Sequence, residues 1–257
     1  MNHDVQKPSL WKRISAALLD FVLIFVLIEG LILLLTSVFG YNSYVERRNA
    51  IEEKYISDYG IIRDLTEEEL AAMPEAEQNA YKAKVEAANK AYQSDEEVIF
   101  LFGKIISLAL MISTLSILFG FLILEFAVPL WLGNGQTIGK KVFGIAVMRV
   151  DGVKVSPISV FARGILGKCT IGTLVPVYLI IMLFFGIMGM VGVVTFIGLF
   201  LLQIILFIFT KYHTPIHDKF AQTLTVDMTT QIIYDSVEEM LEAKKRAAAE
   251  EAEKRER

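Results

Sequence analysis

Long apolar blocks separated by polar segments dominate the chain. A first block covers residues 14–39, and a second lies within residues 98–132. At 1.5 Å per residue, each block is long enough to cross a hydrocarbon core of about 30 Å. The first block is also too long for the apolar core of a signal peptide. The pattern therefore predicts a retained membrane helix at each block.

A third apolar stretch, residues 169–210, contains no charged residue. One straight helix of that length would measure about 63 Å, roughly twice the bilayer core. Two spans, 170–187 and 190–210, fit better, with a turn in the glycine-rich segment 186–192. A re-entrant pair is the alternative for the same residues.

The segment 41–97 has a different composition from the apolar blocks beside it. It holds fourteen Asp/Glu against seven Lys/Arg. Thr66 and Glu69 have the spacing of a helix capping box, and residues 75–92 have the Ala, Glu and Lys content of a solvated helix. We interpret 41–97 as an acidic, helical extramembrane insertion. Its apolar face is too thin for a core of its own, which favours an extension of the flanking spans over a separate binding domain.

Basic residues predominate in the connection 133–168 that follows the second block. Residues 143–150 have strand-like content and end at an Asp-Gly turn signal, and residues 157–167 resemble a short helix along the membrane surface. The short motif at residues 211–226 has a strand-like end, and residues 229–257 form a charged helical tail. The fold class is therefore an all-α membrane protein with about four transmembrane helices. Its parts are 1–40 with the first span, the insertion 41–97, the rest of the membrane domain 98–228, and the tail 229–257.

The composition agrees with a membrane protein, and the distribution of Lys and Arg indicates which side of the membrane each segment faces. The chain is 54% hydrophobic, with a mean hydropathy of +0.50, and its single cysteine excludes an intrachain disulfide. Lys7, Lys12 and Arg13 precede the first span, and the connection 133–168 is basic. By the positive-inside rule, both termini are cytoplasmic and the insertion lies outside. We expect a multi-pass protein of the cell membrane.

Several ionisable or polar residues fall inside the predicted spans. Arg13 and Asp20 share one face of the first helix, about 10 Å apart along its axis. Counted from the inner ends of their spans, Glu125 and Gln203 fall at a depth similar to that of Asp20, which predicts a polar layer. Glu29 falls nearer the outer half of the first span.

Two interpretations of these residues remain open. In the structural lock, Arg13 bridges Asp20 and Asp218 and fastens the C-terminal motif beneath the helices. In the alternative, polar side chains inside the membrane form an ion or proton path, because acids inside a membrane are often functional. The members of this path would be Asp20, Glu29, Glu125 and Gln203. The lock is the favoured interpretation.

The basic residues at the inner boundary are expected to contact lipid headgroups. They are Lys140, Lys141, Arg163 and Lys168. The glycine-rich segment 135–141 lacks the full spacing of a phosphate-binding loop, so a turn at the membrane surface is the better interpretation.

The sequence gives no sign of catalytic chemistry. His213 and His217 flank Pro215, which argues against a regular helical metal site. The chain has no nucleophile elbow, zinc-protease motif or dinucleotide fingerprint. We expect no enzyme activity, no catalytic or metal-binding residues and no cofactor.

Three motifs occur in order along the chain. They are Arg13-x-x-Ala16-Ala17-x-x-Asp20, the segment 135–141 with the sequence GQTIGKK, and His217-Asp218-Lys219 followed by Thr223. Together they resemble the RDD family, small bacterial and archaeal membrane proteins named for one arginine and two aspartates. The resemblance covers residues 8–39 and 98–228, and it implies that Arg13, Asp20 and Asp218 are those three residues. Most family members have no established activity, and ion or proton-coupled transport has been proposed for some.

We therefore expect a multi-pass membrane protein of the RDD type that acts as a structural or accessory membrane component. Ion or proton-coupled transport through intramembrane carboxylates is the alternative. The expected partners are the lipid bilayer and either a second copy of the chain or another membrane protein. Nucleic acid is not expected as a partner.

Overall fold

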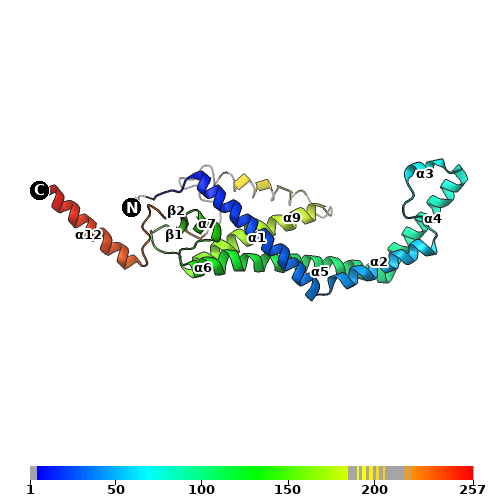
Figure 1. Ribbon diagram of the computed structural model, residues 1–257, viewed down its shortest axis with the longest axis horizontal. Helices are drawn as coiled ribbons and strands as arrows, with labels where there is room; N and C mark the ends of the chain where they lie inside the picture. Colours follow the sequence, from blue (N-terminus) through cyan, green and yellow to red (C-terminus); the bar gives the residue numbers. More distant parts are fainter. Residues whose placement is uncertain are drawn as a thin grey trace. The chain divides into compact units, whose positions relative to one another are not determined.

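Helices dominate the computed structural model of the chain (Figure 1). The structure describes residues 5–184, 218–219 and 221–256, together with 190, 193–194, 197–198, 201–202 and 205. The chain divides into two compact units. Unit 1 contains Met1–Glu29 and Ser116–Arg257, and unit 2 contains Gly30–Leu115.

Three helices within the described residues are long and apolar enough to cross a membrane: Leu10–Val38, Glu96–Leu132 and Pro157–Met182. The first is α1 (Leu10–Val38). The second consists of α5 (Glu96–Phe121), the π-helical segment η1 (Leu122–Ala127) and α6 (Val128–Leu132). The apolar blocks at 14–39 and 98–132 are thus helical, as predicted. Most of the predicted span 190–210 lies outside the described residues.

The third long helix differs from the sequence prediction. The segments α8 (Pro157–Phe161), η2 (Ala162–Leu174, π-helical) and α9 (Val175–Phe184) follow one another without a break. The Ser156 side chain begins this helix by accepting a hydrogen bond from the Ser159 backbone N–H at 3.2 Å. The predicted surface helix at 157–167 and the predicted span from 170 are therefore one helix. Its basic residues Arg163 and Lys168 lie inside a segment of membrane-spanning length, where both have acidic partners.

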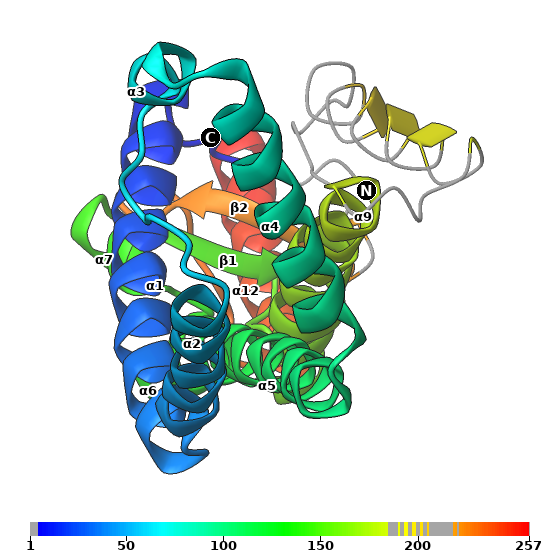
Figure 2. The ribbon, with the colours of Figure 1, turned by 90° about the vertical axis from the view of Figure 1, so that its right-hand side faces the viewer.

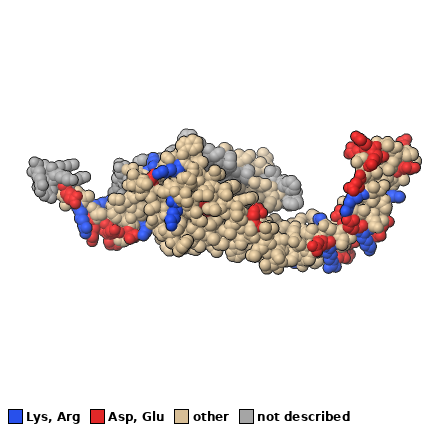
Figure 3. All heavy atoms as spheres, in the orientation of Figure 1, with Lys and Arg blue, Asp and Glu red and all other residues tan. Residues whose placement is uncertain are grey.

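Unit 2 contains the helices expected for segment 41–97. They are α2 (Tyr41–Asp58), α3 (Glu67–Ala72) and α4 (Glu75–Ser94), and Figure 2 shows α2 and α4. Tyr55 of α2 meets Tyr92 of α4 edge to face, with ring centroids 5.7 Å apart. The predicted capping box of Thr66 and Glu69 is present at the start of α3. Charged side chains gather over these helices in Figure 3, as expected for a solvated segment.

Unit 1 also contains a small two-stranded antiparallel sheet beside its helices. Strand β1 (Ile145–Arg149) pairs with β2 (Thr223–Asp227), so that Ile145 lies opposite Asp227 (Figure 2). Both strands had been predicted, but their pairing had not. The buried residues Ala146, Met148, Leu224 and Val226 form a small core around the sheet. Asp218 is held by β2 through the Thr225 hydroxyl, and α7 (Ile138–Val142) packs against β1.

The N-terminus and the C-terminal segment are also joined within unit 1. Lys12 of α1 forms an ion pair with Asp227 at the end of β2, with 2.8 Å between Nζ and Oδ2. Hydrogen bonds from Lys12 and Thr229 lower the pKa of the Asp227 carboxyl to about 2, so this acid is ionised at neutral pH. Beyond β2, the tail forms the predicted helix α12 (Val237–Glu256).

Candidate functional site

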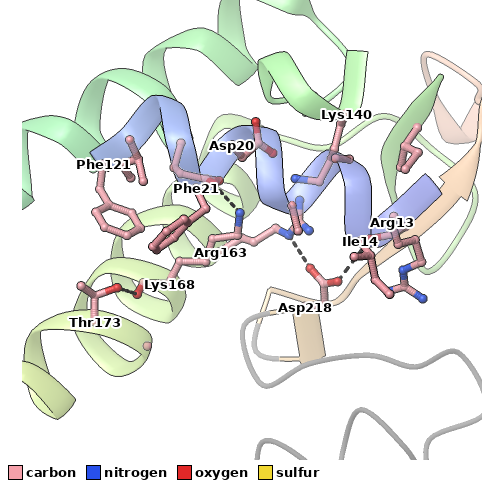
Figure 4. A pocket seen from close by; sticks show the side chains of 17 residues that line it. Arg13, Ile14, Asp20, Phe21, Phe121, Lys140, Arg163, Lys168, Thr173 and Asp218 are labelled. Atoms are coloured by element: carbon pink, nitrogen blue, oxygen red, sulfur yellow. Dashed lines mark hydrogen bonds and ion pairs between the residues drawn. The ribbon is translucent and has the colours of Figure 1, made fainter. Parts of the chain in front are cut away.

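A cavity of about 450 Å³ lies within unit 1, and charged side chains from four helical segments and the chain before β2 line it (Figure 4). The charged lining residues in the described part of the chain are Arg13, Asp20, Glu125, Lys140, Arg163, Lys168 and Asp218. Four are basic and three are acidic. The structure thus brings together residues that are up to 205 positions apart, from Arg13 to Asp218.

Asp20 of α1 is held by the segment at the start of α7. The Thr137 hydroxyl donates to Asp20 Oδ2, and the Gly139 backbone N–H donates to Asp20 Oδ1 at 2.8 Å. A Cβ on Gly139 would overlap the Ala16 carbonyl oxygen and lie within 3.0 Å of the Asp20 carboxylate. The spacing of Thr137 and Gly139 therefore has a physical reason. One residue supplies a hydroxyl, and the other allows two backbones to meet.

Asp218 is paired with an arginine from the third long helix. Arg163 Nε donates to Asp218 Oδ1, and the Thr225 hydroxyl donates to Oδ2 at 3.3 Å. Asp218 is 1% exposed and Arg163 is 7% exposed. Such a pair is maintained only when the surrounding hydrogen bonds compensate for the loss of water, which the threonine helps to do.

Glu125 and Lys168 form a second ion pair that joins η1 to η2. Lys168 Nζ donates to Glu125 Oε1. A Cβ on Gly164 would lie 2.5 Å from the Glu125 carbonyl oxygen, so a glycine lets these two segments approach closely. Both segments are π-helical, a geometry that often occurs where a helix serves a special packing or functional role.

The predicted bridge from Arg13 to both aspartates is corrected for Asp20, which Thr137 and Gly139 hold instead. Asp218 forms an ion pair with Arg163 that was not predicted. Arg13 lines the same cavity, where its positive charge and the negative charge of Asp218 attract each other. Arg163 was missed as a partner because its spacing from Asp218 carries no local signal.

The four basic residues that were expected to contact lipid headgroups differ in how far they are buried. Lys140 and Arg163 are 8% and 7% exposed and line the cavity, so they do not lie on an open membrane surface as expected. Lys168 is partly buried beside Glu125, and Lys141 is the exposed residue of the four. Adjacent lysines on one short helix point in different directions, which composition could not reveal.

The residues of the predicted ion or proton path are only partly brought together. Glu29 is exposed and does not line the cavity, whereas Glu125 and Asp20 both do. Gln203, His213 and His217 lie outside the described residues, so the structure does not place the third member of the predicted polar layer. Within the part of the chain that the structure describes, no group of three His, Cys, Asp or Glu side chains could hold a metal ion.

Lys140 has a markedly shifted ionisation. Burial lowers the pKa of its ammonium group to about 7, and the positive charges of Lys168 and Arg163 act in the same direction. The acids Glu125 and Asp20 oppose this effect and raise the pKa. Lys140 therefore changes its charge near neutral pH, in contrast to an ordinary surface lysine.

This shift predicts that the folded protein becomes more stable as the pH rises from 7 to 9. Over this range the unfolded chain keeps the Lys140 proton while the folded chain loses it, so a higher pH favours folding. The expected gain in unfolding free energy is about 2 kcal/mol, measured by denaturation in detergent in phosphate-free buffer. The variant Lys140→Met should lack this gain, and Lys141→Met should keep it. An identical pH profile in both variants would contradict the shift.

Comparison with known proteins agrees with the three sequence motifs. The family model described as the RDD family matches residues 7–222. No curated protein and no solved structure matches the chain. The matched range extends from the residues before α1 to the residue before β2 and includes all the charged residues of the cavity. The chain therefore belongs to the RDD family.

Proposed function

We propose that this RDD protein is a structural or accessory component of the cell membrane, in which the charges of the cavity hold the membrane helices together. One observation carries the proposal: each acid that lines the cavity accepts a hydrogen bond from a segment other than the one to which the acid itself belongs. Asp20 accepts from the α7 segment, Glu125 from η2, and Asp218 from η2 and β2.

The surface of the long helices supports a place in the bilayer. Phe25 and Leu33 of α1 are largely exposed, as is Trp131 at the end of α6. Exposed apolar side chains along a helix of this length are favourable in hydrocarbon and unfavourable in water. Trp11 and Trp131 lie near the ends of their helices, where interfacial aromatic residues occur. We place both termini on the cytoplasmic side and the helices α2 to α4 outside.

The contacts of the acids favour a structural lock over a cation or proton path. A transported cation needs carboxylates that can bind and release it during each cycle. Here Glu125 and Asp218 already neutralise Lys168 and Arg163, and removing either acid would leave a cation without its partner. The expected partner is a second copy of the chain or another membrane protein, which the accessory role requires.

A flux measurement tests this proposal. The purified chain is placed in vesicles that contain a pH-sensitive dye, under a proton, Na⁺ or K⁺ gradient. We expect the flux to equal that of protein-free vesicles. In cells, Asp20→Asn should lower the amount of protein in the membrane severalfold, because loss of fold stability increases degradation.

Glu29→Gln is the matched control for this experiment, since Glu29 lies on the same helix, is exposed, and does not line the cavity. We expect it to leave the protein amount unchanged. A saturable flux that is lost in Asp20→Asn or Glu125→Gln would contradict the proposal and support the transport alternative.

A further inference from the structure

The cavity gathers more positive than negative side chains among its described residues. Asp218 neutralises Arg163, and Glu125 neutralises Lys168. Asp20 accepts hydrogen bonds from uncharged groups, the Thr137 hydroxyl and the Gly139 backbone.

Lys140 has no comparable ion pair within the described residues. Its Nζ atom makes one hydrogen bond there, to the Thr137 hydroxyl at 3.4 Å, although its side chain is buried. The charges of Arg163 and Lys168 repel it, whereas those of Glu125 and Asp20, which are already bonded to other groups, attract it. Buried like charges that converge on one space are unfavourable unless an opposite charge joins them.

We infer that this cavity binds an anionic phosphate group, with Lys140 as its principal ligand. Lys140 enters from α7 and Arg163 from η2, and both side chains lie in the same part of the cavity in Figure 4. An ammonium and a guanidinium group can together donate several charge-assisted hydrogen bonds to phosphate oxygens. A bound anion would also raise the pKa of Lys140 again, because it favours the charged form.

Part of the lining is apolar. Phe21 and Phe121 lie to one side of Lys140 and Asp218 in Figure 4, and Ile24 also lines the cavity, whose volume of about 450 Å³ is much larger than one phosphate ion. The phosphate group can therefore belong to a lipid headgroup whose apolar part lies along the aromatic rings, or it can be free phosphate. Both sources share the chemistry that Lys140 recognises, and binding experiments separate them.

The test uses the full chain purified in an uncharged detergent and two separate probes. Inorganic phosphate binding is measured by calorimetry. Binding of phosphatidylglycerol, with phosphatidylcholine as the zwitterionic comparison, is measured by native mass spectrometry. Each is repeated with Lys140→Met and with its matched control Lys141→Met, which removes an exposed lysine from the same short helix.

We expect at least one probe to bind saturably to the wild type. Lys140→Met should weaken that binding about tenfold or more, since one charge-assisted hydrogen bond accounts for at least that factor. Lys141→Met should weaken it less than about threefold, because an exposed charge contributes little. This pattern with phosphatidylglycerol alone assigns a lipid headgroup, and the same pattern with inorganic phosphate assigns a free anion.

Two results would overturn the inference. One is saturable binding of neither probe, and the other is an equal loss of binding in both lysine variants, which would indicate general surface attraction. If Lys140→Met fails to fold, Ala17→Phe is compared with Lys141→Met in the same binding measurements. Ala17 lines the cavity, and a larger side chain there reduces its volume while keeping every charge. Unchanged affinity in Ala17→Phe would likewise overturn the inference.

Discussion

Asp218→Asn is expected to lower the unfolding free energy of the protein by about 3–5 kcal/mol, because it leaves a buried arginine without its acid. Arg163 is 7% exposed, so water cannot replace the lost carboxylate. The free energy can be measured in detergent micelles by titration with sodium dodecyl sulfate.

Asp151→Asn provides the control for this substitution. Asp151 pairs with Arg149 at 2.7 Å, but both side chains are partly exposed, and such pairs contribute about 0–1 kcal/mol. If Asp218→Asn reduced stability no more than Asp151→Asn, the ion pair with Arg163 would have no structural role.

The second large effect is expected for Gly139→Ala. The added Cβ would overlap the Ala16 carbonyl oxygen and crowd the Asp20 carboxylate. Overpacking of this kind costs about 1–3 kcal/mol, and loss of the hydrogen bond to a charged acceptor adds about 1.5–3 kcal/mol. We therefore expect a loss of about 3 kcal/mol or more, and a strong decrease in the amount of folded protein extracted from membranes.

Gly103→Ala is the matched control, because a Cβ on Gly103 in α5 would have no heavy atom within 4 Å. Alanine in a helix interior should leave stability unchanged or raise it by up to about 1 kcal/mol. Equal stability of the two alanine variants would show that α7 does not approach α1 as closely as described.

The helices and strands could be predicted from local features of the sequence. Apolar length defines α1 and the helix Glu96–Leu132, and the Thr66 capping box marks the start of α3. Strand-like apolar content and an Asp-Gly turn signal indicated β1, and the strand-like end of the motif at 211–226 indicated β2. These features depend only on residues that are close together in the sequence, so they can be recognised without knowledge of the fold.

The partners in the cavity could not be predicted in the same way. Which cation meets Asp218 depends on how α8, η2 and the β1–β2 pair are arranged, and no spacing encodes it. Basic residues beside a membrane helix also resemble anchors on the open membrane surface, and the sequence does not show that Lys140 and Arg163 turn into a cavity instead. A usable signal did exist for Asp20. Thr137 is an N-cap residue, and the backbone N–H groups of the helix turn that follows it have no partner within the helix, so that a carboxylate can accept from them.

A double-mutant cycle between Arg163 and Asp218 measures whether buried charges from distant segments hold unit 1 together. The unfolding free energy is measured for the wild type, Arg163→Met, Asp218→Asn and the double variant. We predict a coupling energy of about 2–3 kcal/mol, since residues in one buried ion pair are strongly non-additive. A coupling near zero, with the two single effects simply adding, would contradict the account.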